Sequence, residues 1–316
     1  MMNSGIVYAL LAGAIWAGVI VGPSLLPDFN AVLISSARFA LYGLFSLLVA
    51  LPFARRLFAR LTRGEVMLLL RLSLTGNVLN YALLGAAIQL SGVTAAALIN
   101  GMLPIAITFQ GRNDTGSLPI NKLKLPLLMV FLGIVSICIE RAVQTASDVP
   151  LSSQLLGIAC GLCGVVSWSW FATHNSRYLK QSSFNSREWS TLLGIVTGGV
   201  AVVFGVVALA LFPNLIPTGI EHSRWMTFLW VSLFLALCGS WLANSLWNAC
   251  SRRMASSLSG QMIVFETVFA CIYGFIYTRH FPGFVELASI CLLVGGVLWS
   301  ARRHQVPVVK LDQPSC

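Results

Sequence analysis

Glu266 has the clearest potential for chemistry, because it is an acidic residue in the middle of a long apolar run at 256–277. An ionisable group is costly within a lipid bilayer and is therefore a candidate for function. Three roles are open to it. The carboxylate could carry protons during coupled transport, it could neutralise the amine of a substrate, or it could be a protonated group that hydrogen-bonds a neighbouring helix and fixes packing.

Amide and aromatic side chains fall on helical stripes in two other apolar runs. They are spaced i, i+3, i+4 in run 66–90 and i, i+3, i+7 in run 225–249, which places each group on one face. Amides with aromatic surfaces suit a zwitterionic or neutral solute. For each amide alone, the alternative is an interhelical hydrogen bond of about 0.6 kcal/mol. With single residues from other runs, the predicted substrate-binding set is Asn77, Asn80, Tyr81, Asn100, Trp168, Trp241, Asn244, Asn248, Gln261 and Glu266.

Arg38 is a lone basic residue several positions inside run 31–52. We expect its side chain to extend along the helix to the outer surface, and attraction of a substrate carboxylate is the alternative. The four histidines lie at or beyond the ends of the apolar runs, and no nucleophile motif or phosphate-binding glycine loop is present. The sequence therefore predicts no enzyme activity, no metal and no cofactor, with an intramembrane enzyme as a minor alternative.

The composition requires a membrane environment for these residues. Hydrophobic residues make up 57% of the 316, and charged residues make up only 9%, against about 25% in soluble domains. Ten apolar runs approach the ~20 residues that cross a ~30 Å hydrocarbon core. We therefore expect an all-α integral membrane protein with ten transmembrane helices, at 5–25, 31–52, 66–90, 92–110, 124–140, 153–174, 190–211, 225–249, 256–277 and 284–301. The joint at Ser91-Gly92 is the weakest boundary, so a chain of nine spans is the alternative.

Basic residues predict the orientation of these spans, because short loops rich in Lys and Arg stay in the cytoplasm. Fifteen of the 20 Lys and Arg residues lie in the loops after even-numbered spans or in the C-terminal tail, whereas only three lie on the opposite side. Both termini are thus expected in the cytoplasm. Since topology accounts for the net charge of +10, no nucleic-acid partner is expected.

The two halves of the sequence resemble each other. The segment from Gly5-Ile6 to Trp16 has the same spacing as that from Gly157-Ile158 to Trp168, and Gly133-Ile134 matches Gly296-Val297. Five spans per half would give the copies opposite orientations in the membrane, which is typical of secondary transporters. We predict a first five-helix repeat at 1–150 and a second, inverted repeat at 151–316.

The order of several short motifs also resembles the EamA-type permeases of the drug/metabolite transporter superfamily over nearly the whole chain. The motifs are Ala14-Ile15-Trp16, Tyr81-Ala82-Leu83, Ser91-Gly92-Val93-Thr94-Ala95, Leu103-Pro104-Ile105, Trp247-Asn248-Ala249, Phe265-Glu266-Thr267-Val268-Phe269-Ala270 and Leu293-Val294-Gly295-Gly296-Val297. Thr267 stands where the family usually has a proline, so we expect a straighter ninth span here.

The resemblance implies a secondary transporter of the bacterial inner membrane that exports small metabolites by alternating access, with amino acids as the leading class. Spans three, four, eight and nine are expected to line its pocket. Efflux of lipophilic cations is the alternative within transport, with Glu266 neutralising the cargo. A membrane scaffold without transport activity is the alternative in another class, and the sequence does not determine the oligomeric state.

Overall fold

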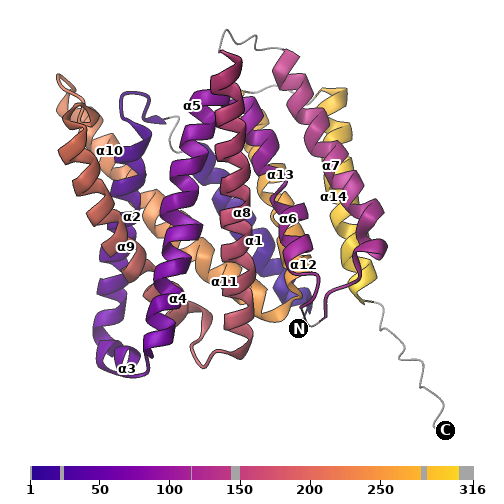
Figure 1. Cartoon of the computed structure of the whole chain (residues 1–316), viewed down its shortest axis with the longest axis horizontal. Coiled ribbons are helices and arrows are strands. Elements are labelled where there is room, and N and C mark those ends of the chain that lie inside the picture. The colour runs from indigo at the N-terminus through magenta and orange to yellow at the C-terminus, as the bar shows by residue number, and fades with distance from the viewer. Residues whose placement is uncertain (1, 22–24, 115, 144–149, 279–282, 306–316) are drawn as a thin grey trace.

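The computed structural model describes residues 2–21, 25–114, 116–143, 150–278 and 283–305, and these residues contain helices but no strand. Two helix starts at the lower side of Figure 1 are capped by side chains. Thr62 and Glu65 form a capping box before α4, as do Asn185 and Glu188 before α9. The elements are α1 (Met2–Val21), α2 (Ala31–Ala50), η2 (Leu51–Phe53), α3 (Ala54–Ala59), α4 (Arg63–Ser73), η3 (Leu74–Val78), α5 (Leu79–Asn100), α6 (Leu103–Gln110), α7 (Ile120–Val143), α8 (Leu151–Gln181), α9 (Ser186–Leu211), η4 (Pro213–Leu215), α10 (His222–Phe234), η5 (Leu235–Leu242), α11 (Ala243–Arg253), α12 (Ser256–Gln261), α13 (Val264–Thr278) and α14 (Phe284–Gln305).

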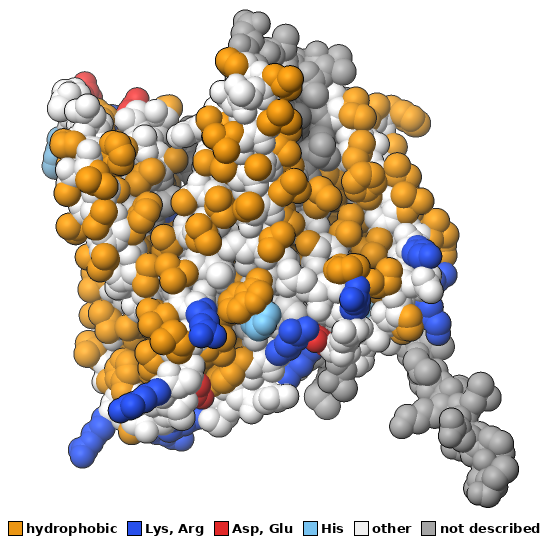
Figure 2. Space-filling model, in the orientation of Figure 1, with side chains coloured by type: hydrophobic (Ala, Val, Ile, Leu, Met, Phe, Trp, Pro, Cys, Tyr) orange, Lys and Arg blue, Asp and Glu red, His pale blue; other side chains and the backbone are white. Residues whose placement is uncertain are grey.

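Five helical segments in the described part are long and apolar enough to cross a membrane. Figure 2 shows hydrophobic side chains over the middle and upper parts of the visible face, whereas Lys and Arg gather along its lower edge. Apolar surface of this extent is suited to lipid rather than water. The prediction of an all-helical protein with membrane-spanning helices is confirmed at this level. The five segments are Ala31–Ala59, Arg63–Ser91, Leu151–Gln181, Ser186–Leu211 and His222–Arg253.

Helix α5 reverses its direction within its own length. A Cβ placed on Gly161 of α8 would lie 3.1 Å from Ile99 and 3.5 Å from Ala87. In a straight helix, Ala87 and Ile99 would be about 18 Å apart. The reversal lies near Leu90 and Ser91, which approach Gly157 at the upper end of α8. The chain therefore turns back close to the predicted joint at Ser91-Gly92.

The helices pack in pairs that join distant parts of the sequence. Helix α5 lies against α8, α7 against α14, and α2 against α9, while α1 contacts both α11 and α13 and α6 contacts α12. The α2–α9 contact is the tightest of these, because a Cβ on Gly198 would come within 2.4 Å of Gly43 Cα. Glycines at such crossings allow helix backbones to approach closely.

Irregular segments interrupt several of the helices in the described part of the chain, and four of them fall into two similar pairs. The segments η3 and η5 are π-helical, a geometry that often marks functional sites. Turns at Gly101-Met102 and Met262-Ile263 separate α5 from α6 and α12 from α13. The chain around Thr267 is a regular helix, and the interruption lies before it. Thr267 lies within α13, but the chain is interrupted five residues earlier without a proline.

Candidate functional site

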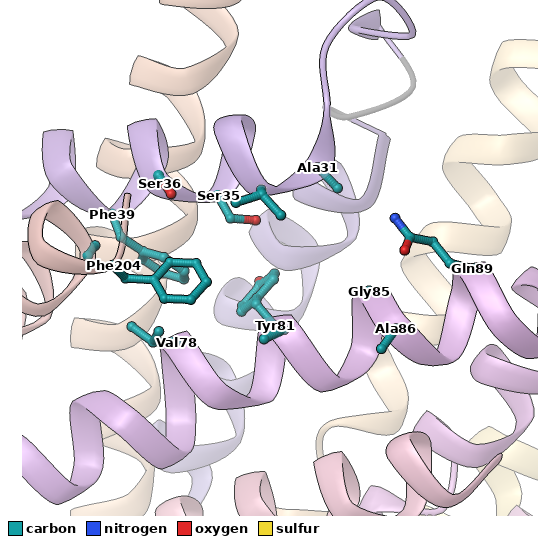
Figure 3. Close-up of a pocket in the computed structure, with 13 residues that line it drawn as sticks. Ala31, Ser35, Ser36, Phe39, Val78, Tyr81, Gly85, Ala86, Gln89 and Phe204 are labelled. Atoms are coloured by element: carbon teal, nitrogen blue, oxygen red, sulfur yellow. The ribbon is translucent and has the colours of Figure 1, made fainter. Parts of the chain in front are cut away.

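A cavity of about 180 Å³ lies between α2, α5 and α9 (Figure 3). Phe39, Phe204 and Val78 form one end, and Ala31 and Gln89 form the other, where both residues are exposed. No charged side chain lines the cavity. The lining residues are Ala31, Val32, Ser35, Ser36, Phe39, Val78, Tyr81, Ala82, Gly85, Ala86, Gln89, Ala201 and Phe204.

A small residue maintains open space in the cavity, and a buried, unpaired hydroxyl lies beside the cavity. A Cβ on Gly85 would meet no atom within 4 Å, so a larger side chain at this position would enter the cavity. The Ser36 hydroxyl is buried and has no hydrogen-bond partner within the described residues. A buried, unpaired hydroxyl costs free energy unless water or a ligand binds it.

Arg38 lies directly behind the inner end of this cavity. It is 6% exposed, and it donates from Nη1 to the Tyr81 hydroxyl at 2.7 Å and from Nε to Ser240 Oγ at 3.0 Å. Its guanidinium also faces the rings of Phe39 and Tyr81 at 5.2 and 5.0 Å. The expectation that Arg38 extends to the outer surface is wrong, because its side chain turns inward. We call Arg38, Tyr81 and Ser240 the Arg38 cluster.

The π-helical segment η5 shapes the far side of the Arg38 cluster. Ser240 belongs to η5 and donates back to the carbonyl of Leu235, 3.3 Å away. The neighbouring Gly239 carbonyl accepts a hydrogen bond of 2.9 Å from Trp16 Nε1. A Cβ on Gly239 would approach Arg38 Nη2 to 3.5 Å. The irregular helix thus gives the guanidinium both a hydroxyl partner and room.

Glu266 lies in the first turn of α13, partly buried, with its backbone next to Gly13 of α1. None of the ion pairs formed by described residues includes it. The Arg38 guanidinium attracts its carboxylate through space, without direct contact. The two residues therefore share an electrostatic environment at the centre of the bundle, and Glu266 stays a candidate for coupling.

Asn248 is in a closed polar network away from the cavity. It donates to Ser190 Oγ at 2.7 Å and accepts from Asn175 Nδ2 at 2.7 Å, while Asn175 accepts from Trp189 Nε1 at 2.8 Å. All four residues are at most 1% exposed. We call Asn175, Trp189, Ser190 and Asn248 the Asn175–Asn248 network. Its arrangement is that of interhelical hydrogen bonds, the alternative left open for each amide.

Of the stripe in run 66–90, only Tyr81 lines the cavity. Asn77 is buried and donates to Thr197 Oγ1 of α9 at 3.2 Å. Asn80 is also buried and faces Gly164 of α8, where a Cβ would lie 3.6 Å from its Oδ1. One predicted stripe thus supplies a cavity residue and two contacts between helices.

Asn100 and Gln261 each precede a helix interruption, at the ends of α5 and α12. Asn100 is partly buried. Gln261 is fully buried, and its Nε2 donates to Thr108 Oγ1 at 3.3 Å, whereas its Oε1 has no partner among the described residues. The two amides therefore occupy comparable places in the two halves of the chain.

The predicted aromatic residues occupy two separate places. The centroid of the Trp168 ring lies 6.4 Å from that of Trp16 and 6.3 Å from that of Trp247. These three rings form a central group from α1, α8 and α11. Trp241 donates to Thr191 Oγ1 at 3.1 Å. Its neighbour Asn244 is partly buried and lies near the Tyr42 hydroxyl. Neither Trp168 nor Trp241 lines the cavity described above.

Arg38 and Trp247 are absent from the predicted substrate-binding set. A lone arginine in an apolar run was a visible signal for Arg38, but its direction depends on η5, which the sequence did not reveal. Trp247 is buried with an unpaired Nε1, and its partners come from two distant helices. Among the residues described, no group of three or more His, Cys, Asp or Glu could hold a metal ion.

Comparison with known proteins gives a relative over almost the full length. The chain is 30% identical over 315 residues to inner membrane protein YtfF of Escherichia coli (strain K12), with 95% of this chain and 96% of YtfF covered. The chain belongs to the YtfF family. The name of that relative places it in the inner membrane, in agreement with the apolar helices found here. No protein-family model matches the chain.

A solved crystal structure shares the fold. It superposes with a TM-score of 0.73 at 18% sequence identity, covering 97% of this chain and 100% of the other. At this identity the likeness concerns the arrangement of helices alone.

Proposed function

We propose that this protein is a secondary transporter of the EamA type that moves small metabolites, with amino acids as the leading class, across the bacterial inner membrane by alternating access. It would have ten spans in two inverted five-helix repeats and no catalytic role. The observation that carries the proposal is the matching set of helix contacts and helix interruptions in the two halves of the chain.

The helix contacts support two inverted repeats. In this arrangement α1 corresponds to α8, α5 to α11, and α6 to α13. The contact of α5 with α8 then has its counterpart in the contact of α11 with α1. The contact of α6 with α8 likewise has its counterpart in the contact of α13 with α1. The pairs α2–α9 and α7–α14 each join corresponding helices. Trp16 and Trp168, which the repeat relates, contact each other near the centre. Contacts of this kind are expected around a two-fold axis in the membrane plane.

The interruptions support the same correspondence. The π-helical segments η3 and η5 occupy equivalent positions in the third and eighth spans, and the turns at Gly101-Met102 and Met262-Ile263 interrupt the fourth and ninth. Paired discontinuous helices near the middle of the membrane are the best pointer to a transporter's binding site. Non-helical backbone at this depth is tolerated where it is buried in protein or lines a cavity.

The orientation follows from the positive-inside rule. Helix α1 starts and α14 ends at the lower side of Figure 1, the side at which Lys and Arg gather in Figure 2. We infer that this side faces the cytoplasm. The cavity, with its exposed end at Ala31 and Gln89, would then lie toward the periplasm.

The charge at the centre favours a zwitterion over a lipophilic cation as the cargo. The buried Arg38 repels a permanent cation, whereas a zwitterion offers it a carboxylate and offers Glu266 an amine. A membrane scaffold has no need of a cavity next to a buried charge.

The direct test is uptake of radiolabelled L-amino acids into proteoliposomes, with and without an imposed pH gradient, for wild type and Glu266→Gln. We expect saturable flux that follows the gradient in wild type and loses this dependence in the variant. Empty liposomes provide the background.

Each other outcome has a definite meaning. Flux that ignores the gradient in both proteins would assign Glu266 to packing and make the protein a facilitator. Absence of flux for every amino acid, together with flux of a lipophilic cation, would replace the amino-acid proposal with the cation alternative. Absence of all flux would contradict transport.

A further inference from the structure

The Arg38 guanidinium is a buried positive charge whose hydrogen-bond partners are neutral. Both acceptors, the Tyr81 and Ser240 hydroxyls, are uncharged. Within the described part of the chain no carboxylate oxygen lies within 4.0 Å of it, and its Nη2 donates to no residue. Glu266 acts on the guanidinium only through space, and burial of a charge without a counter-ion in direct contact is costly. The guanidinium therefore has both the charge and a free donor for an anionic ligand.

Tyr81 connects this charge with the cavity. Its hydroxyl accepts the hydrogen bond from Arg38, and the same side chain lines the cavity. Figure 3 shows Tyr81 rising from α5 toward α2, between Phe39 and Gly85. A rotation of this one side chain would open the guanidinium to a solute in the cavity.

The size and polarity of the cavity restrict the solute. Its volume of about 180 Å³ is below the roughly 300–1,000 Å³ of pockets for drug-sized ligands, so the solute is small. The lining offers the Gln89 amide at the open end and the apolar rings of Phe39 and Phe204 at the other end. Because the lining is uncharged, recognition of a solute's charge falls to Arg38.

We propose that the cavity between α2, α5 and α9 binds a small carboxylate solute, whose carboxylate accepts hydrogen bonds from Arg38 and from the Tyr81 hydroxyl. The Gln89 amide supplies a further donor at the open end of the cavity. This assignment rests on the proposed transport function, because it names the chemical class of the cargo. It makes the carboxylate, rather than the amine, the group that the protein requires.

The test compares acids with their amides in thermal unfolding of the purified full-length protein in detergent. The probes are the 20 common L-amino acids, the matched amino-acid amides, and mono- and dicarboxylates of two to six carbons. A ligand that binds only the folded protein raises the unfolding midpoint in proportion to its affinity. We expect some acids to raise the unfolding midpoint. Their amides should need at least tenfold higher concentrations to raise the midpoint equally, because an amide cannot form the charged hydrogen bond.

Two pairs of variants locate the effect. Arg38→Gln should remove the preference for the acid, and Arg38→Lys should retain part of it. Gly85→Leu should fill the cavity and weaken binding of every probe at least tenfold. Gly199→Leu is the matched control, because a Cβ on the exposed Gly199 of α9 also meets no atom within 4 Å but the residue does not line the cavity.

The outcomes separate this inference from the proposed function. One outcome is that acids stabilise wild type but not Arg38→Gln, while no flux is seen in proteoliposomes. This outcome would support the binding site and contradict transport. Flux of amides as fast as flux of acids would retain transport and overturn the inference, as would an undiminished acid preference in Arg38→Gln. If Arg38→Gln does not fold, the comparison of Gly85→Leu with Gly199→Leu decides. Equal stabilisation of these two variants by the acids would overturn the inference. Lack of stabilisation by every carboxylate would overturn it as well.

Discussion

The Asn175–Asn248 network and the Arg38 cluster are both buried polar groups, yet their hydrogen bonding differs. In the network, amide, indole and hydroxyl groups are joined at 2.7–2.8 Å, and none of these residues lines the cavity. In the Arg38 cluster, a charge has only neutral partners and lies one side chain from open space. Saturated hydrogen bonding indicates a group that holds helices together, whereas unused capacity beside a cavity indicates a group that binds a ligand.

The largest effect on stability is expected for Asn248→Leu. The substitution leaves the Asn175 amide and the Ser190 hydroxyl without their partner in a buried site, at a cost of about 1–3 kcal/mol each. We expect a strongly lowered thermal midpoint and low membrane abundance. Transport per folded molecule should change little.

Asn244→Leu is the matched control on the same helix. The nearby Tyr42 keeps a 2.7 Å hydrogen bond to the Ser190 carbonyl, so the loss of stability should be smaller than for Asn248→Leu. Equal destabilisation by the two substitutions would remove the distinction between the network and its surroundings.

A smaller effect is expected for Gly198→Ala, which tests whether the α2–α9 contact is rigid. The new methyl would lie within 2.4 Å of Gly43 Cα, and relief of such overlap typically costs about 1–3 kcal/mol. The neighbouring Gly199→Ala places its methyl in open space and should be neutral or stabilising. The difference between the two thermal midpoints measures the contact, and identical midpoints would contradict a tight α2–α9 interface.

The smallest effect on stability is expected for Arg38→Met, although its effect on transport should be large. Removal of a buried charge that has no counter-ion in direct contact relieves its desolvation cost, and Ser240 retains its bond to the Leu235 carbonyl. We expect a thermal midpoint close to that of wild type, with loss of carboxylate uptake. A severe loss of stability would place Arg38 with the Asn175–Asn248 network, as a structural group.

The sequence predicted the helical class well because composition and apolar run length depend on local residues. The reversal of α5 near Ser91 could also be placed, since a glycine follows and the apolar pattern pauses there. The inward direction of Arg38 could not be predicted, because it depends on the π-helical turn that brings Ser240 across from another helix. The amides show the same limit, since the spacing that put Asn248 on a polar stripe did not reveal Asn175 and Ser190 as its partners.

The most direct test of alternating access is the distance across the cavity mouth. Spin labels on Ala31→Cys of α2 and Gln89→Cys of α5, in a variant that lacks the eight native cysteines, report this distance by double electron–electron resonance in proteoliposomes. Both sites are exposed, so the labels should be tolerated. We predict that a saturating, transported solute shifts the distribution to a shorter distance as the mouth closes. An unchanged distribution with such a solute would contradict alternating access through this cavity.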